Sequence, residues 1–274
     1  MCIRDRLYLG KYEVREIKAP DGYVLNNEPK DVELTYAGQE FEVRDTVNTE
    51  FENEYQRVMI RLSKTMENDE LSGIGSNGEY KNVRFGLFAA EDITAANGTS
   101  IPAGGLISEI SLEEDMSAQF DTALPFGKYY VQEIATDEHY VLNGEKYLVT
   151  FEYMGQDIQT VDIDCGEFEN IIKRGRIEGH KTDDKSEPLE NAVFGLFRKD
   201  CKVFSESNAI MTAVSDEKGY FEFGNIPYGE YVVREIKAPR GYILSNKSYP
   251  VSISEDGEVI EITAENKPIT VEIS

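Results

Sequence analysis

The alternation of apolar and polar residues along this chain predicts short β-strands. Turn sequences rich in glycine, proline and aspartate separate the alternating segments. No segment sustains a helical period, although residues 112–120 could hold one helical turn. Short strands at this spacing predict an all-β fold of antiparallel β-sandwiches. In the final third of the chain the expected strands are residues 176–182, 192–198, 219–223, 230–237, 247–254 and 258–265.

The same alternating pattern returns three times. The run that begins at Tyr12 recurs at Tyr129 and Tyr231, and each copy carries a glutamate near its centre. A spacing of about 100 residues is too long for a solenoid repeat and matches separate domains. Glu16 to Glu133 is 133 − 16 = 117 positions, and the same offset relates Asn53 to Asn170 and Lys64 to Lys181.

These repeats predict the domain boundaries. The residues just before Tyr12 match those before Tyr129, whereas residues 1–6 match nothing and are predicted to be foreign to the fold. Both ends of the sequence are therefore expected to be cuts in a longer protein. The predicted segments are 1–54, the C-terminal half of a truncated domain; 55–171 and 172–267, two complete domains; and 268–274, the first strand of a further truncated domain.

Strand parity directs three polar residues of each complete copy toward the core. Side chains two positions apart share a face, so Lys64 lies with Ile60 and Leu62, and Glu133 lies with Val131. The first copy keeps the Glu and the Asn and lacks the Lys-bearing strand. The core-facing residues predicted in this way are Lys64, Glu133 and Asn170 in the second copy and Lys181, Glu235 and Asn266 in the third, with Glu16 and Asn53 in the first.

A buried Lys, Glu and Asn together suggest a reaction. Desolvation makes a lysine lose its proton more readily and become a nucleophile, and it raises the pKa of a buried glutamate. The Asn side chain supplies the electrophilic carbonyl carbon. Attack of the lysine amine on that amide, with the glutamate moving protons, expels ammonia and joins the first and last strands of a domain.

Each residue type also has an ordinary structural interpretation. A strand lysine commonly extends its charge to water, an asparagine near a strand end commonly belongs to a turn, and a strand glutamate commonly faces solvent. All three types recur in the same order and on apolar parity in both complete copies. That recurrence favours the cross-link.

Composition narrows the classes of partner and site. The formal net charge is −24, and no basic stripe is present to meet nucleic acid or an anionic membrane surface. No stretch of eighteen apolar residues is present, so we expect no membrane contact within this sequence. The three cysteines lack CxxC spacing and one would remain unpaired, which supports neither a disulfide framework nor a zinc site. We expect no metal and no cofactor.

The run from Tyr231 to Tyr242 resembles the glutamate box of collagen-adhesin B-type domains, also called prealbumin-like domains, of Gram-positive surface proteins and pilins. The resemblance implies a β-sandwich with an autocatalytic Lys–Asn isopeptide bond, used as a stiff stalk module. Residues 136–140 depart from the usual Ala-Pro-x-Gly-Tyr. The implied bonds join Lys64 to Asn170 with Glu133 assisting, and Lys181 to Asn266 with Glu235 assisting.

Three classes of function are weighed on this basis. The first is the stalk of a wall-anchored adhesin or pilin-like protein, outside the cell, whose full-length form would be a sortase substrate. The second is an adhesive module that binds a host extracellular-matrix protein or glycan through loops such as residues 91–105. An enzyme acting on an external substrate is the weakest, because His139 and His180 are the only histidines and no catalytic or phosphate-binding motif is present.

Overall fold

The computed structural model describes residues 7–36, 49–70, 72–94 and 98–271 and confirms an all-β fold. Its helices in these ranges are two short 3-10 turns, Glu79–Asn82 and Glu206–Asn208. The helical turn expected within residues 112–120 is wrong. Strand β8 (Ser117–Thr122) lies there because its alternate residues Ala118 and Phe120 are buried. The segment predicted to be foreign, residues 1–6, and the last residues of the predicted further domain, 272–274, lie outside the described residues.

The contacts divide the chain into two compact units, described separately below. Unit 1 comprises Met1–Ser63, Phe85–Gln132 and Glu145–Glu167, and unit 2 comprises Lys64–Arg84, Glu133–Gly144 and Phe168–Ser274. Three strands have several residues in each unit, and the core-facing residues predicted for both complete copies fall in unit 2. These strands are β3 (Arg57–Met66), β9 (Gly127–Ala135) and β11 (Thr160–Asn170).

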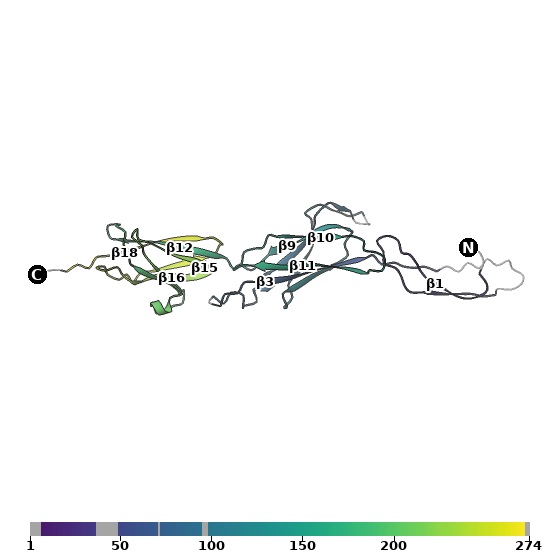
Figure 1. Cartoon of the computed structure of the whole chain (residues 1–274), viewed down its shortest axis with the longest axis horizontal. Coiled ribbons are helices and arrows are strands. Elements are labelled where there is room, and N and C mark those ends of the chain that lie inside the picture. Colours follow the sequence, from purple (N-terminus) through teal and green to yellow (C-terminus); the bar gives the residue numbers. More distant parts are fainter. Residues whose placement is uncertain (1–6, 37–48, 71, 95–97, 272–274) are drawn as a thin grey trace. The chain divides into compact units, whose positions relative to one another are not determined.

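Unit 2 contains a complete sandwich of two sheets (Figure 1). One sheet has the order β15-β12-β18 and the other the order β14-β13-β16-β17. All six strands expected in this part of the chain are present. Strand β14, which the pattern missed, is a four-residue edge strand with a single buried side chain. The strands are β12 (Arg174–Asp183), β13 (Val193–Arg198), β14 (Met211–Val214), β15 (Tyr220–Pro227), β16 (Gly229–Lys237), β17 (Ser248–Ile253) and β18 (Val259–Asn266).

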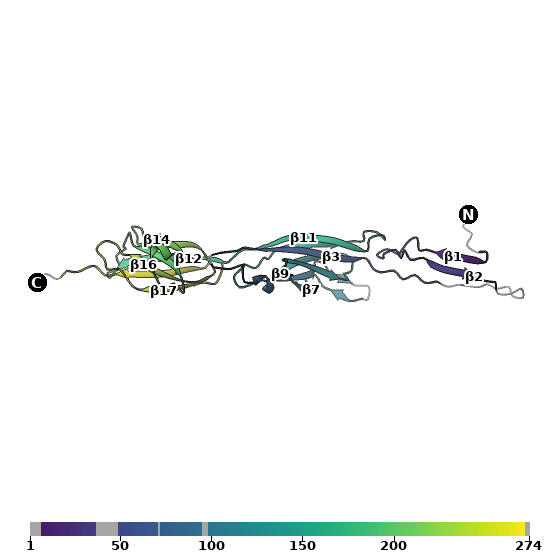
Figure 2. The same cartoon turned by 90° about the horizontal axis from the view of Figure 1, so that it is seen from below.

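Side chains from both sheets form the core of this sandwich. Figure 2 shows strands of the two sheets, among them β12, β14, β16 and β17, in a second view. Phe194 of β13 stacks on Phe221 of β15 with ring centroids 3.9 Å apart, and Ile177 of β12 is fully buried beside them. Burial of each such side chain contributes roughly 1.5 to 3 kcal/mol. Gly179 leaves room for this stack, because a Cβ there would lie 2.1 Å from the Phe221 ring.

The first and last strands of this sandwich run parallel, which refines the expectation of antiparallel pairing. In the β12–β18 ladder Lys181 lies opposite Ala264, and Asp183 lies opposite Asn266. The other ladders recorded in this sandwich are antiparallel. Since parallel strands end at the same edge, the C-terminal ends of β12 and β18 lie side by side.

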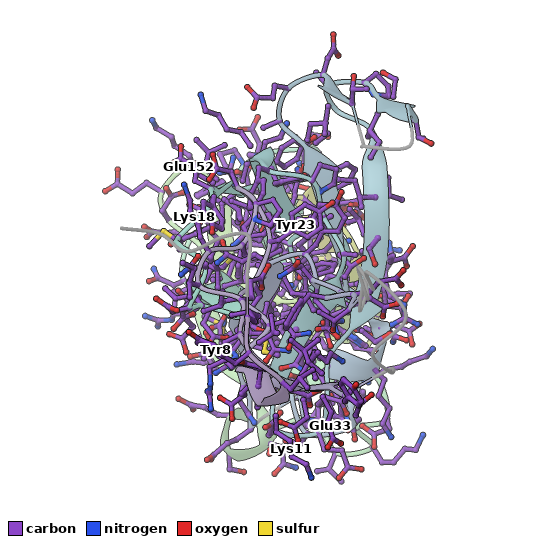
Figure 3. The ribbon with its side chains drawn as sticks, turned by 90° about the vertical axis from the view of Figure 1, so that its right-hand side faces the viewer. Tyr8, Lys11, Lys18, Tyr23, Glu33 and Glu152 are labelled. Carbon is purple, nitrogen blue, oxygen red and sulfur yellow. The ribbon has the colours of Figure 1, made fainter. Side chains whose placement is uncertain are left out.

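Unit 1 holds most of a second pair of sheets and two separate two-stranded ladders, β1–β2 and β5–β6. The sheets have the orders β10-β9-β4-β7 and β11-β3-β8. In the β1–β2 ladder Lys11 lies opposite Glu33, and both residues are labelled in Figure 3. The remaining strands are β1 (Gly10–Val14), β2 (Lys30–Leu34), β4 (Arg84–Ala89), β5 (Ile93–Thr94), β6 (Ser100–Ile101), β7 (Leu106–Ser111) and β10 (Lys146–Phe151).

Candidate functional site

The polar residues that parity directs inward are buried in both complete copies. Each is at most 3% exposed, on the same strand faces as core residues such as Leu62 and Val131. Such burial is rare for lysine and glutamate unless they are paired. We call the two groups the Lys64 site (Lys64, Glu133 and Asn170) and the Lys181 site (Lys181, Glu235 and Asn266).

In the Lys64 site one carboxylate oxygen contacts both other residues. Glu133 Oε1 lies 3.5 Å from Lys64 Nζ and accepts a 2.8 Å hydrogen bond from Asn170 Nδ2. Its second oxygen accepts the backbone N–H of Asn143 at 2.7 Å. Asn170 Nδ2 also donates to the hydroxyl of Thr136 at 2.6 Å. The prospective nucleophile and the amide nitrogen that would leave therefore both lie beside the same carboxylate oxygen.

Burial dominates the electrostatics of the Lys64 site. It lowers the pKa of Lys64, although the charge of the neighbouring Glu133 opposes this shift. It raises the pKa of Glu133, although hydrogen bonds from Asn143 and Asn170 and the charge of Lys64 oppose that shift. Both directions favour a neutral amine beside a protonated carboxyl group. A neutral amine is the nucleophilic form of lysine.

The Lys181 site shares the Glu–Asn contact. Asn266 Nδ2 donates to Glu235 Oε2 at 3.0 Å and to the carbonyl of Ile243 at 2.8 Å. The same carboxylate oxygen accepts the backbone N–H of Ser245 at 2.8 Å. The pairing of Glu235 with Asn266 therefore repeats the pairing of Glu133 with Asn170.

The lysine of this second site is directed differently. Lys181 Nζ donates to the backbone carbonyls of Thr182 at 2.9 Å and Ala264 at 3.2 Å. Burial lowers its pKa, while the charge of Glu235 acts in the opposite direction. Asn266 lies on the neighbouring strand, two residues beyond Ala264 and on the same face. Lys181 and Asn266 therefore lie on adjacent strands, while the lysine amine is directed to backbone carbonyls.

Several buried atoms of these two sites have no hydrogen-bond partner in the described structure. An unpaired buried polar atom costs about 1 to 3 kcal/mol, so proteins retain few of them. The lone atoms include the amide oxygens of both candidate asparagines. The atoms recorded are Lys64 Nζ, Asn170 Oδ1, Glu235 Oε1 and Asn266 Oδ1.

The first copy forms the Glu–Asn pair from residues 16–53. Asn53 Nδ2 donates to Glu16 Oε2 at 2.7 Å and to the carbonyl of Val24 at 2.9 Å. Glu16 Oε2 also accepts the backbone N–H of Asn26 at 2.8 Å. Both side chains are half-buried, and Glu16 lies beyond the end of β1, not within the strand as its pattern suggested.

Two features of the site were not found from the sequence. One is the backbone N–H, ten positions after each glutamate, that holds the carboxylate; the spacing is constant, but the residue is Asn26, Asn143 or Ser245. The other is the Thr136 hydroxyl, which lies within the segment that departs from the repeated motif. The only sign of Thr136 in the sequence is that residues 136–140 differ from the repeated Ala-Pro-x-Gly-Tyr motif.

Other candidate chemistry is sparse in the described residues. The cysteines there, Cys165 and Cys201, are free. The search of these ranges for clusters of three or more His, Cys, Asp or Glu side chains able to hold a metal ion found none. In the same ranges no helix has the length and apolar character needed to cross a membrane.

Comparison with known proteins places these sites in a family context. A protein-family model described as SpaA, prealbumin-like fold domain, matches residues 4–49, 68–164 and 175–268. A collagen adhesin of Staphylococcus aureus is 29% identical over 112 residues, which are 40% of this chain and 9% of that protein. The trypsin-resistant surface T6 protein of Streptococcus pyogenes serotype M6 is 29% identical over 102 residues, 36% of this chain and 18% of that protein.

Solved structures were compared with the chain as well. The Bacillus anthracis TIE protein has a TM-score of 0.67 and 25% sequence identity, over 95% of this chain and 42% of that one. This chain therefore spans less than half the length of each of these three proteins.

Proposed function

This chain belongs to the family of SpaA-type prealbumin-like fold domains, as its glutamate boxes suggested, and we propose that it is a stalk segment of a surface adhesin or pilin-like protein. In this proposal, intramolecular Lys–Asn isopeptide bonds stiffen its domains. The observation that carries the proposal is the shared oxygen of Glu133, which contacts Lys64 Nζ and Asn170 Nδ2 inside the core.

The reaction at the Lys64 site is balanced without a cofactor. Lys64 transfers a proton to the Glu133 carboxylate, and the neutral amine attacks Asn170 Cγ. The new Nζ–Cγ bond forms as the Cγ–Nδ2 bond breaks. Glu133 delivers the proton that the leaving nitrogen needs and recovers one from Nζ, so that ammonia departs and an amide remains.

The energetics of burial support this direction. Before reaction the core holds an amine and an amide oxygen without hydrogen-bond partners. Conversion of the amine into an amide removes a group that would otherwise be charged in a low-dielectric interior. The same reaction at the Lys181 site requires Lys181 Nζ to leave the carbonyls of Thr182 and Ala264 and turn toward Asn266.

The position of each bond suits a load-bearing stalk. The chain enters the last sandwich at β12 and leaves it at β18, and the proposed bond joins Lys181 of β12 to Asn266 of β18. Tension along the chain then passes through this covalent bond. Residues 182–265, which form most of the sandwich, are shielded from it.

Related proteins support the proposed location. The Streptococcus pyogenes relative is described as a surface protein and the Staphylococcus aureus relative as a collagen adhesin. We place this chain outside the cell in the same way, as part of a wall-anchored protein joined to the wall by sortase. Adhesion to a host matrix protein or glycan through residues 91–105 stays a prediction, because residues 95–97 lie outside the described structure.

Intact-mass spectrometry of the folded full chain tests the cross-links. We expect a mass lower than the sequence mass by two molecules of ammonia, and Glu133→Gln or Glu235→Gln should each restore one. Glu167→Gln, at an exposed glutamate of β11, is the matched control and should keep both losses. A folded wild-type chain with its full sequence mass would refute the isopeptide proposal.

A further inference from the structure

The two sites hold the leaving amide nitrogen with different groups. At the Lys181 site the second N–H of the asparagine amide goes to the Ile243 carbonyl, eight positions after the glutamate. The first copy uses the equivalent Val24 carbonyl. At the Lys64 site Asn170 Nδ2 donates instead to the Thr136 hydroxyl, three positions after the glutamate. One of the three copies therefore replaces a carbonyl with a hydroxyl.

The change from a carbonyl to a hydroxyl results from a different side chain at one position and not from a different backbone. The position of Thr136 is occupied by Ala19 in the first copy and Ala238 in the third. The backbone keeps its arrangement in both copies. Val141 donates its N–H to the carbonyl of Ile171 at 2.9 Å, and the equivalent Val24 donates its N–H to the carbonyl of Glu54 at 2.8 Å. A different fold of the strand is therefore not the cause. The hydroxyl itself changes what the asparagine amide contacts.

We propose that Thr136 is a further catalytic residue of the Lys64 site, an inference that rests on the proposed cross-link. The hydroxyl oxygen of Thr136 accepts the hydrogen bond that a backbone carbonyl accepts in the other two copies. Before reaction the planar amide nitrogen of Asn170 donates to Thr136. When Lys64 adds to Cγ, that nitrogen becomes pyramidal and gains a lone pair.

Glu133 transfers its proton to this single lone pair, and the Thr136 oxygen continues to accept an N–H of the same nitrogen. The nitrogen is then positively charged, and a hydrogen bond from a charged donor is stronger than one from a neutral amide. Thr136 therefore stabilises the leaving group most as ammonia departs, and no proton passes through Thr136. A gain of about 1.4 kcal/mol from this bond corresponds to about a tenfold change in rate.

Kinetics of bond formation in the full chain test this role. The chain is made by cell-free synthesis, translation is stopped, and samples are quenched in acid over time. Peptide mapping then gives the fraction joined at Lys64–Asn170 and, separately, at Lys181–Asn266. The Lys181 site has no threonine at this position and serves as the internal control in every sample.

We expect Thr136→Val, which keeps the shape and removes the hydroxyl, to slow joining of Lys64 to Asn170 about tenfold. Thr136→Ala should slow it similarly, and Thr136→Ser should restore a rate close to that of the wild type. The rate at the Lys181 site should be unchanged in all three. Trypsin resistance checks folding, and the alanine variant keeps the test valid if valine prevents folding.

Two failures are distinguishable. Equal rates in the wild type and in the folded Val and Ala variants would overturn the role of Thr136 and leave the cross-link intact. Slowing that serine does not restore would also overturn it, because the effect would then come from packing. Absence of any joined Lys64–Asn170 peptide in folded wild type would overturn the proposed function, and the role of Thr136 with it.

Discussion

Replacement of Lys64 by methionine should remove the cross-link of the second copy and little else. Methionine has a similar length and no charge, so it fits the face that Lys64 shares with Ile60 and Leu62. The substitution also removes a buried amine that lacks a hydrogen-bond partner. Burial raises the pKa of the neighbouring Glu133, so its carboxyl group is expected to become neutral when the amine is lost. The local effect is then expected to be small, and a large loss of stability reports the missing bond.

The size of that loss follows from the length of chain that the bond closes. Lys64 and Asn170 are 170 − 64 = 106 positions apart. In the chain-entropy description a cross-link over such a loop stabilises the folded state by about 4.8 kcal/mol, by analogy with a disulfide. For a domain of this size that corresponds to a decrease in Tm of roughly 20 °C or more.

Differential scanning calorimetry of the full chain, combined with intact-mass spectrometry, measures both consequences. Lys64→Met should retain one additional ammonia and shift one transition downward, while the other transition is unchanged. Lys128→Met, at an exposed lysine of β9, is the matched control and should change neither quantity. If Lys64→Met retains the ammonia and yet melts with the wild type, the loop-closure reasoning is refuted.

Further predictions concern charge, the junction after β11 and packing. Burial opposes ionisation of Glu79, but hydrogen bonds from backbone N–H groups outweigh it and lower the pKa of this carboxyl group. The stabilisation from Glu79 is therefore present above its ordinary pKa and is lost as the pH falls through the folded value. Glu79→Gln should make the protein less stable to urea at pH 7 and not at about pH 2, and an equal loss of stability at both pH values would contradict this. Glu67 Oε2 accepts the N–H of Ile172 at 2.8 Å; Glu67→Ala should accelerate hydrogen exchange of that amide about tenfold, whereas Glu70→Ala, at an exposed position, should not. Gly179→Ala places a methyl group 2.1 Å from a core ring and should cost about 1 to 3 kcal/mol in denaturant unfolding; unchanged stability would show that the ring moves freely.

Much of the fold follows from alternation, because alternation reports which face of a strand is buried. All six strands expected after residue 172 are present, and Lys181 lies on the buried face that parity gave it. Alternation does not specify strand direction. The parallel pairing of β12 with β18 depends on contacts between residues more than eighty positions apart, which no local pattern records.

The sequence predicts which residues form the candidate sites better than it predicts which atoms these residues contact. Burial of Glu133 and Asn170 follows from strand parity. The orientation of the Lys181 side chain does not follow from strand parity. This side chain has several rotatable bonds, and its amine donates hydrogen bonds to nearby backbone carbonyls. The contact of Thr136 with Asn170 also depends on a side-chain rotation, which the sequence leaves open.

The three copies also indicate when the proposed bond can form. Glu16 and Asn53 meet in a segment of fewer than forty residues, so the carboxylate and the amide are brought together by chain that is close in sequence. The lysine arrives from the first strand of its domain, more than eighty positions before its asparagine, by pairing of that strand with the last. Its amine reaches the amide only after this long-range pairing is complete. In this proposal the chemistry follows closure of the sandwich, and the bond would fix a fold that is already native.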